Sequence, residues 1–327
     1  MKNYFIVLIG GLISAIIAGL VVIPLLKKLK FGQNILGYVK EHDYKSGTPT
    51  MGGIIFMIST AAVFFAFSSG KRSLAFVSIA VGFAYMTVGA LDDLIKIKLK
   101  RNEGLNPIQK TLFELAIALI IAFYAQRQGL TKAYIPFLGE TVELKYWHFP
   151  LCVFIFIATT NSVNLTDGLD GLAGGVSYVY FAFLAAIIYI QTSKNAASYV
   201  NASEYRNLVL LLCSLVGGIL GFLCFNTFKA SVFMGDTGSL SLGGYIASIS
   251  LLSGNMFFIP IIGIMYVATS ISVILQVAHF KRTGERIFLM SPLHHHFQQK
   301  GFSESKIGFA YKIVTLIAGV ISVISCL

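Results

Sequence analysis

Apolar stretches, each near the length of a bilayer-crossing helix, follow one another along the whole chain. A crossing helix takes about 20 predominantly apolar residues. Ten stretches of about this kind occur, at about 4–26, 51–68, 73–91, 109–126, 149–163, 171–191, 207–225, 240–254, 256–279 and 307–326. The stretch 240–254 is the least typical, because it is short and rich in Gly and Ser. The pattern predicts an all-α polytopic membrane protein of about ten transmembrane helices, forming a single integral-membrane domain over residues 1–327.

One connecting segment has a different pattern. Residues 131–147, TKAYIPFLGETVELKYW, alternate between apolar and polar positions around Gly139-Glu140. A period of two with glycine at the turn is typical of a β-hairpin. We therefore expect a small hairpin in an outer loop, lying over the bundle.

The basic residues predict the orientation, because Lys and Arg favour cytoplasmic loops. Loops that follow the odd-numbered stretches hold sixteen Lys and Arg residues, and the other side holds eight. Both termini are therefore predicted to be extracytoplasmic. The first stretch begins almost at Met1 and shows no small-residue cleavage site, which indicates a retained span rather than a cleaved signal peptide.

The composition excludes an ordinary soluble enzyme. Only 12% of the 327 residues are charged and 56% are hydrophobic, whereas soluble domains contain roughly 25% charged residues. The net charge of +11 reflects scarce acid (14 Asp and Glu) more than abundant base (25 Lys and Arg). Topology explains the basic excess, so no nucleic-acid partner is expected. The four cysteines lie in apolar stretches without a CxxC pair, which argues against a zinc or disulfide framework.

The few Asp residues are placed selectively. All six fall in predicted cytoplasmic loops or at the cytoplasmic ends of apolar stretches: Asp43, Asp92, Asp93, Asp167, Asp170 and Asp236. Five of the six His residues lie on the same side, and the outer loops contain Glu but no Asp. We therefore expect the cytoplasmic face to hold the functional site.

Two adjacent carboxylates, Asp92 and Asp93, close the third stretch, and Lys96 follows them. At a helix C-terminus they face the negative end of the helix dipole, and they repel each other. Two interpretations stay open at this point. The pair is either a polar stop to the span, or it binds a metal ion or takes up a proton.

Amide and carboxylate side chains recur at a spacing of three between the fifth and sixth stretches: Asn161, Asn164, Asp167 and Asp170. This spacing places them on one face of a helical turn, and Gly168 would let the backbone approach a ligand closely. A capping turn for the next helix is the alternative.

The segment 226–239 contains Asn226, Phe233 and Asp236. Asp236 is either the cap of the following helix or a hard oxygen ligand for Mg²⁺. Phe233 is an interfacial anchor or a stacking face for a base, and the sequence does not decide between these.

Three consecutive histidines, His294, His295 and His296, lie in the last predicted cytoplasmic loop. Adjacent side chains of a regular helix or strand cannot all reach one ion, so a zinc site is disfavoured. We expect a polar patch that hydrogen-bonds a substrate through two of the three rings.

Two smaller segments have residues suited to phosphate. Lys45 and Thr50 precede the second stretch, where the alternative is a plain turn with a helix cap. Lys110 opens the fourth stretch, where a cation opposes the helix dipole. This unfavourable position indicates a nearby anion.

Several segments resemble the motifs of a known superfamily, the polyprenyl-phosphate N-acetylhexosamine-1-phosphate transferases. They are DDLIK (92–96), NSVNLTDGLDGL (161–172), NTFKASVFMGDTGSLSLGG (226–244) and SPLHHHFQQKGFSE (291–304). Within that superfamily, KSGTPTMGG (45–53) and the uninterrupted HHHF resemble the bacterial phospho-N-acetylmuramoyl-pentapeptide transferases. The resemblance runs in order from about 45 to 306.

The resemblance implies a reaction, a cofactor and a set of site residues. The implied reaction transfers phospho-MurNAc-pentapeptide from UDP-MurNAc-pentapeptide to undecaprenyl phosphate, with Mg²⁺, giving lipid I and UMP at the bacterial cytoplasmic membrane. Asp92, Asp93 and Asp236 would be catalytic, with Asp236 binding the metal ion. The substrates would contact Lys45, Thr50, Lys96, Lys110, Asn161, Asn164, Asp167, Gly168, Asp170, Asn226, Phe233, Gln276, His294, His295 and His296.

Several alternatives remain at this stage. A sister enzyme that uses UDP-N-acetylglucosamine is the closest, although the unbroken His run argues against it. A nucleotide-sugar or magnesium transporter is disfavoured because the span centres hold almost no charge. We favour a single displacement over a phospho-enzyme, since both substrates can meet at one metal ion. The sequence leaves open whether two copies form a homodimer.

Overall fold

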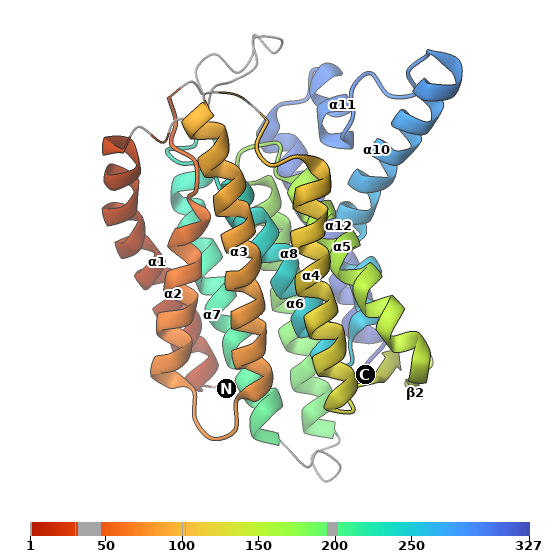
Figure 1. The fold of residues 1–327 in the computed structure, drawn as a ribbon. Helices are drawn as coiled ribbons and strands as arrows, with labels where there is room; N and C mark the ends of the chain where they lie inside the picture. The colour runs from red at the N-terminus through yellow and green to blue at the C-terminus, as the bar shows by residue number, and fades with distance from the viewer. Residues whose placement is uncertain (1, 30, 32–46, 100, 102, 195–201) are drawn as a thin grey trace.

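The computed structural model describes residues 2–29, 31, 47–99, 101, 103–194 and 202–327. Lys45 lies outside these residues. The described helices are α1 (Lys2–Lys28), α2 (Gly53–Phe67), α3 (Ser73–Leu99), α4 (Pro107–Arg127), α5 (His148–Thr166), α6 (Leu172–Lys194), α7 (Ala202–Asn226), α8 (Gly235–Leu252), α9 (Ile259–Ile262), α10 (Ile264–Thr283), α11 (Leu293–Gln299) and α12 (Glu304–Ile324). The 3₁₀ turns η2 (Lys145–Trp147) and η3 (Met256–Phe258) precede α5 and α9. Most helices run side by side in a bundle, from which α10 diverges (Figure 1).

The predicted apolar stretches lie on these helices, except that the stretch 256–279 is divided among η3, α9 and α10. Eight described helices are long and apolar enough to span a membrane, namely α1, α3, α4, α5 with η2, α6, α7, α10 and α12. The helix α2 has 15 residues and is shorter than the spanning length. The prediction of an all-α polytopic membrane protein is confirmed, with eight candidate spans among the described residues.

The helix α8 explains why the stretch 240–254 is atypical. Every residue from Thr237 to Leu252 is buried, so this helix is surrounded by protein instead of lipid. A helix in that position does not need large apolar side chains. It needs small residues that let neighbours approach: a Cβ added at Gly243 would overlap the Thr160 backbone of α5, and one at Gly244 would overlap the Tyr85 ring of α3.

The predicted hairpin is confirmed. Strands β1 (Lys132–Ile135) and β2 (Glu140–Glu143) pair antiparallel, with Ile135 opposite Glu140. The hairpin packs on the end of α8, because the Tyr134 amide donates to the Gly254 carbonyl at 2.8 Å. The Tyr134 ring also stacks on Phe258.

Both termini lie at the same end of the bundle (Figure 1). Two contacts with the last turns of α6 fix this arrangement. The Tyr4 ring meets Tyr189, and the Lys194 ammonium donates to the Cys326 carbonyl at 3.1 Å. The helix α3 starts at this end and finishes at the other, and Asp92 and Asp93 lie in its last part. The side of the membrane on which each end lies stays a prediction.

Candidate active site

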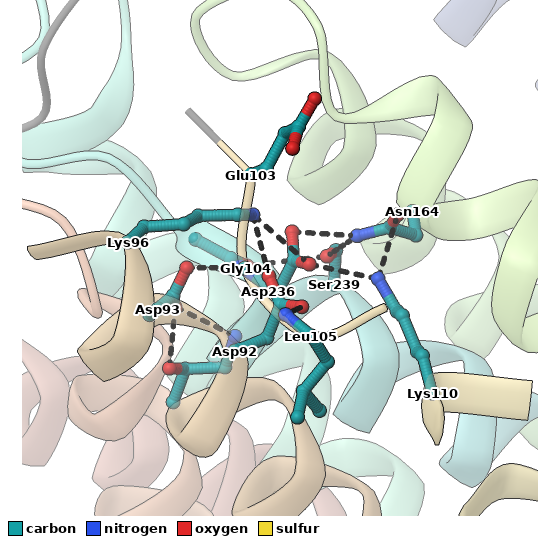
Figure 2. Close-up of polar contacts among 12 residues, drawn as sticks. Asp92, Asp93, Lys96, Glu103, Gly104, Leu105, Lys110, Asn164, Asp236 and Ser239 are labelled. Atoms are coloured by element: carbon teal, nitrogen blue, oxygen red, sulfur yellow. Dashed lines mark hydrogen bonds and ion pairs between the residues drawn. The ribbon is translucent and has the colours of Figure 1, made fainter. Parts of the chain in front are cut away.

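Carboxylates from two helices meet at the end of the bundle opposite the termini. Asp92 and Asp93 lie in the last part of α3, and Asp236 lies in the first turn of α8. Each offers an oxygen within 4.8 Å of the others. Figure 2 shows Lys96 and Lys110 pointing toward the same centre. Three of the six Asp residues, from two segments that are distant in the sequence, therefore form one cluster in space.

The Asp93 carboxylate holds the beginning of α8. It accepts hydrogen bonds from the backbone amides of Asp236 at 3.2 Å and Thr237 at 3.0 Å, and from the Thr237 hydroxyl at 2.6 Å. The free amides and the positive dipole end of a helix N-terminus stabilise an anion there. Asp93 thus caps α8 from another helix, and both of its oxygens are engaged.

The Asp92 carboxylate is buried beside the segment that leads into α4. Its Oδ1 accepts from the Leu105 amide at 2.9 Å. Its Oδ2 forms an ion pair of 2.6 Å with Lys96, one turn further along α3. Because neither oxygen is part of a helix cap, Asp92 is freer than Asp93 to act on a ligand.

Asp236 is the electrostatic centre of the cluster. Its Oδ2 lies 2.8 Å from the Lys110 ammonium and 3.2 Å from that of Lys96, and its Oδ1 accepts from the Asn164 amide at 3.0 Å. Burial by itself would raise the pKa of Asp236, but the two ammonium groups hold the pKa well below its usual range. The Asn164 amide also donates to Ser239 at 2.8 Å and is thereby fixed on α8.

The cluster fits a divalent cation by its donor atoms and by its charge. Carboxylate oxygens are ligands that Mg²⁺ prefers, and each ionised carboxylate has more lone pairs than the contacts above occupy. Asp92, Asp93 and Asp236 with Lys96 and Lys110 have one uncompensated negative charge. Asp236 and Asp92 are the residues that could hold the ion, whereas Asp93 is engaged with α8. No ion is part of the structure, and metal binding stays a proposal.

Sequence reasoning did not select Glu114, a fully buried carboxyl one turn beyond Lys110 in α4. Its Oε2 accepts from the Asn161 amide at 2.6 Å. Asn161, predicted to contact substrate, is therefore attached to Glu114 and also donates to the Ile157 carbonyl. The available signal was a Glu four residues after Lys110 inside an apolar stretch.

The loop between α5 and α6 has two different functions in the structure. Asp167 ends α5 next to the acidic cluster: burial, followed by the charges of Asp236, Asp93 and Asp170, raises its pKa well above the usual range. The Asp170 carboxylate instead accepts from the Ala230 amide at 3.1 Å, so it joins this loop to the α7–α8 connection.

Asn226 shapes the same connection from the end of α7. Its amide donates to the Val232 carbonyl at 2.9 Å, and its Oδ1 accepts from the Gly171 amide at 3.2 Å. The backbone of Phe233 pairs with Pro49 and Gly52. These bonds bring the segment with Thr50 against the beginning of α8, where Thr50 lies beside Gly235.

The three histidines of α11 have different surroundings. His294 is fully buried with its ring against Gly168, and burial followed by the charge of His295 lowers its pKa to about 3. His295 shares a 2.7 Å hydrogen bond with Gln298. His296 accepts from the Leu289 amide at 3.1 Å. A patch in which two of three rings face substrate stays a prediction, and His294 is the ring that faces the protein.

Gln276 of α10 holds the segment before α11. Its Oε1 accepts from the amides of Ile287 at 3.1 Å and Phe288 at 2.9 Å. Together with His296 it fixes the backbone of residues 287–289. The contacts of Gln276 are therefore structural, and its predicted contact with substrate is not tested by them.

Comparisons with known proteins show the family of the chain. Residues 75–254 match the family model "Glycosyl transferase family 4". Asp92, Asp93 and Asp236 lie within this range. Residues 45–57 match the phospho-N-acetylmuramoyl-pentapeptide-transferase signature 1, which includes Lys45 and Thr50.

Relatives with the name phospho-N-acetylmuramoyl-pentapeptide-transferase match almost the whole chain. The protein of Caldanaerobacter subterraneus subsp. tengcongensis is 45% identical over 305 residues, 93% of this chain and 92% of the relative. That of Thermoanaerobacter sp. (strain X514) is 41% identical over 320 residues, 97% of each. That of Clostridium perfringens (strain SM101 / Type A) is 44% identical over 308 residues, 93% of this chain and 91% of the relative.

Proposed function

Because this chain belongs to the phospho-N-acetylmuramoyl-pentapeptide-transferase family, we propose that it transfers phospho-MurNAc-pentapeptide from UDP-MurNAc-pentapeptide to undecaprenyl phosphate. The products are lipid I and UMP. The chain is a transferase of the first membrane step of peptidoglycan synthesis. The identities of the nucleotide donor and the lipid acceptor are the proposed part.

The observation that supports this reaction most directly is the group of three carboxylates and two lysines at one end of the bundle. Phosphoryl transfer depends mainly on positioning and on neutralising phosphate charge. Lys96 and Lys110 can each turn from Asp236 to a phosphate oxygen, since both are held only by ion pairs and hydrogen bonds. Mg²⁺ held by Asp236 and Asp92 would supply further positive charge at the pyrophosphate.

The reaction proceeds as a single displacement. An oxygen of the lipid phosphate forms a bond to the sugar-linked phosphorus, and the bond from that phosphorus to the bridging oxygen breaks, so that UMP leaves with the bridging oxygen. Asp92 accepts the proton of a singly protonated lipid phosphate. The contacts support this assignment, because the Asp93 oxygens bind three donors at the start of α8, whereas Asp92 binds one backbone amide and the Lys96 side chain, which can move away.

The proposed location is the bacterial cytoplasmic membrane, with the acidic cluster on the cytoplasmic face. The basic residues support this orientation: Lys27, Lys28, Lys96 and Lys98 lie in the last turns of helices that end on the side of the cluster. A nucleotide donor is available only from that side.

The test is Asp236→Asn, with UMP release measured over a range of Mg²⁺ concentrations. Groups around a metal ligand already contribute about 10–100-fold, so we expect release to fall by about 100-fold or more. Glu143→Gln, at the opposite end of the bundle, is the control. If Asp236→Asn keeps the full, Mg²⁺-dependent activity, the assignment of Asp236 as a metal ligand is wrong. If the unsubstituted chain releases UMP from UDP-N-acetylglucosamine and not from UDP-MurNAc-pentapeptide, the proposed donor is wrong.

A further inference from the structure

The distance between the carboxylates of α3 and Asp236 of α8 depends on how closely these two helices approach. Asp92 and Asp93 can share a centre with Asp236 only if the backbone at the start of α8 lies directly against α3. Two residues outside the acidic group, Gly89 and Thr237, are located at this contact.

Gly89 lies one turn before Asp93 in α3 and provides the space. A Cβ built on Gly89 would overlap the backbone carbonyl of Asp236 and approach the Thr237 amide nitrogen at 2.6 Å. Backbone atoms cannot move away as the end of a flexible side chain can. Any larger residue at this position must therefore push the first turn of α8, including Asp236, away from α3.

Thr237 provides the attachment. Its amide and hydroxyl both donate to the Asp93 Oδ2, at 3.0 and 2.6 Å, while the Asp236 amide donates to the Oδ1 at 3.2 Å. Thr237 is fully buried, so water cannot replace its hydroxyl. The Asp93 carboxylate therefore binds the backbone on both sides of Cα of Asp236 and sets the direction of its side chain.

We propose that Gly89 and Thr237 are positioning residues for the transfer reaction. Gly89 sets the separation of α3 and α8, and Thr237 with Asp93 sets the rotation of the α8 first turn, so that Asp236 and Asp92 can share one divalent cation. This proposal rests on the proposed function, since it assumes that the cluster binds the cation.

The variants are chosen in pairs. Gly89→Ala is compared with Gly82→Ala, which lies two turns earlier in α3 and would meet the Tyr245 ring of the same helix α8. Thr237→Val, which removes the hydroxyl and keeps the shape, is compared with Thr237→Ser, which keeps the hydroxyl. All are measured as the full chain in detergent.

Three measurements separate positioning from general stability. They are the dissociation constant of Mn²⁺ by electron paramagnetic resonance without substrate, kcat and KM for UMP release, and the unfolding midpoint. Groups that orient metal ligands typically contribute about 10–100-fold in affinity or activity. We therefore expect Gly89→Ala to weaken Mn²⁺ binding and lower kcat by about tenfold or more, with little change in KM for the nucleotide donor.

Gly82→Ala is expected to lower the unfolding midpoint and leave the Mn²⁺ dissociation constant unchanged. Thr237→Val is expected to weaken Mn²⁺ binding, and Thr237→Ser to restore it. Equal Mn²⁺ affinity in Gly89→Ala and Gly82→Ala, or in Thr237→Val and Thr237→Ser, would overturn the positioning role. If Gly89→Ala does not fold, the Thr237 pair decides. Failure of the unsubstituted chain to bind Mn²⁺ would overturn the metal assignment itself, and this proposal with it.

Discussion

Neighbouring residues of the same type have different tasks in this site. Asp92 and Asp93 are adjacent in the sequence, yet Asp93 points at the amides of α8 and Asp92 points at Lys96 and the Leu105 amide. In a helix, consecutive side chains diverge by about 100°, so the two carboxylates reach different neighbours. One of them therefore stabilises the fold, and the other is available for chemistry.

Substitution by Asn distinguishes the two. Asp93→Asn places the NH₂ of the new side chain against the donors at the start of α8. A buried donor left without an acceptor lowers the free energy of unfolding by roughly 1–3 kcal/mol. We expect both the unfolding midpoint and the UMP release to fall. Asp92→Asn is expected to abolish UMP release with an unfolding midpoint close to that of the unsubstituted chain. Full activity of Asp92→Asn would contradict its assignment as the base.

The burial of His294 leads us to expect that the stability of the folded chain depends on pH. Its pKa in the folded chain is lowered to about 3 by burial, whereas an unfolded His has a pKa of about 6.5. The unfolded state therefore takes up the proton first, and the stability from neutral His294 is present above pH ~6.5 and is lost as pH falls toward 3.

We expect His294→Asn to reduce the loss of unfolding midpoint between pH 7 and pH 5, measured in detergent, relative to the unsubstituted chain. An identical pH profile for His294→Asn would show that this ring does not resist protonation in the folded chain.

At the scale of the elements, α8 differs from the other apolar helices because its neighbours are helices on all sides. The helix is stabilised by close packing against its neighbours, and its small residues allow these neighbours to approach its backbone. Not every helical glycine has this function. Gly308 of α12, for example, has open space where a Cβ would lie.

This difference predicts opposite effects of the same substitution. Gly243→Ala would overlap the Thr160 backbone and should cost about 1–3 kcal/mol through overpacking. Gly308→Ala should be neutral or stabilise by about 0.5–1 kcal/mol, because Ala is the better helix former. The unfolding midpoints of the two variants measure this, and a similar loss in both would mean that α8 is not packed as described.

At the scale of the whole molecule, the helices place both termini at one end of the bundle and the acidic cluster at the other. Eight described helices are long and apolar enough to span a membrane, and we infer that the two ends of the bundle face different compartments. The site therefore has access to one compartment only, and the orientation of the chain determines which one.

Reporter fusions measure this orientation. Alkaline phosphatase fused after Leu327 should be active, and green fluorescent protein fused there should be dark, because the basic residues predict extracytoplasmic termini. Fusions after Gly284, which ends α10 at the site end, should give the reverse. The opposite pattern would place the acidic cluster outside, where no nucleotide donor is available.

The sequence determined the class of the protein, most of the helices and the hairpin, and it singled out the three carboxylates that meet in the structure. Apolar length, alternation and the placement of six Asp residues are local properties, and a single chain displays them. The sequence did not determine the separate tasks of Asp92 and Asp93, the burial of His294 or the presence of Glu114 behind Asn161. These depend on which side chains from distant helices meet, and only tertiary packing sets those distances. For the same reason, only the structure explains why the short stretch rich in Gly and Ser forms an inner helix: α8 is surrounded by protein, and the fold decides that.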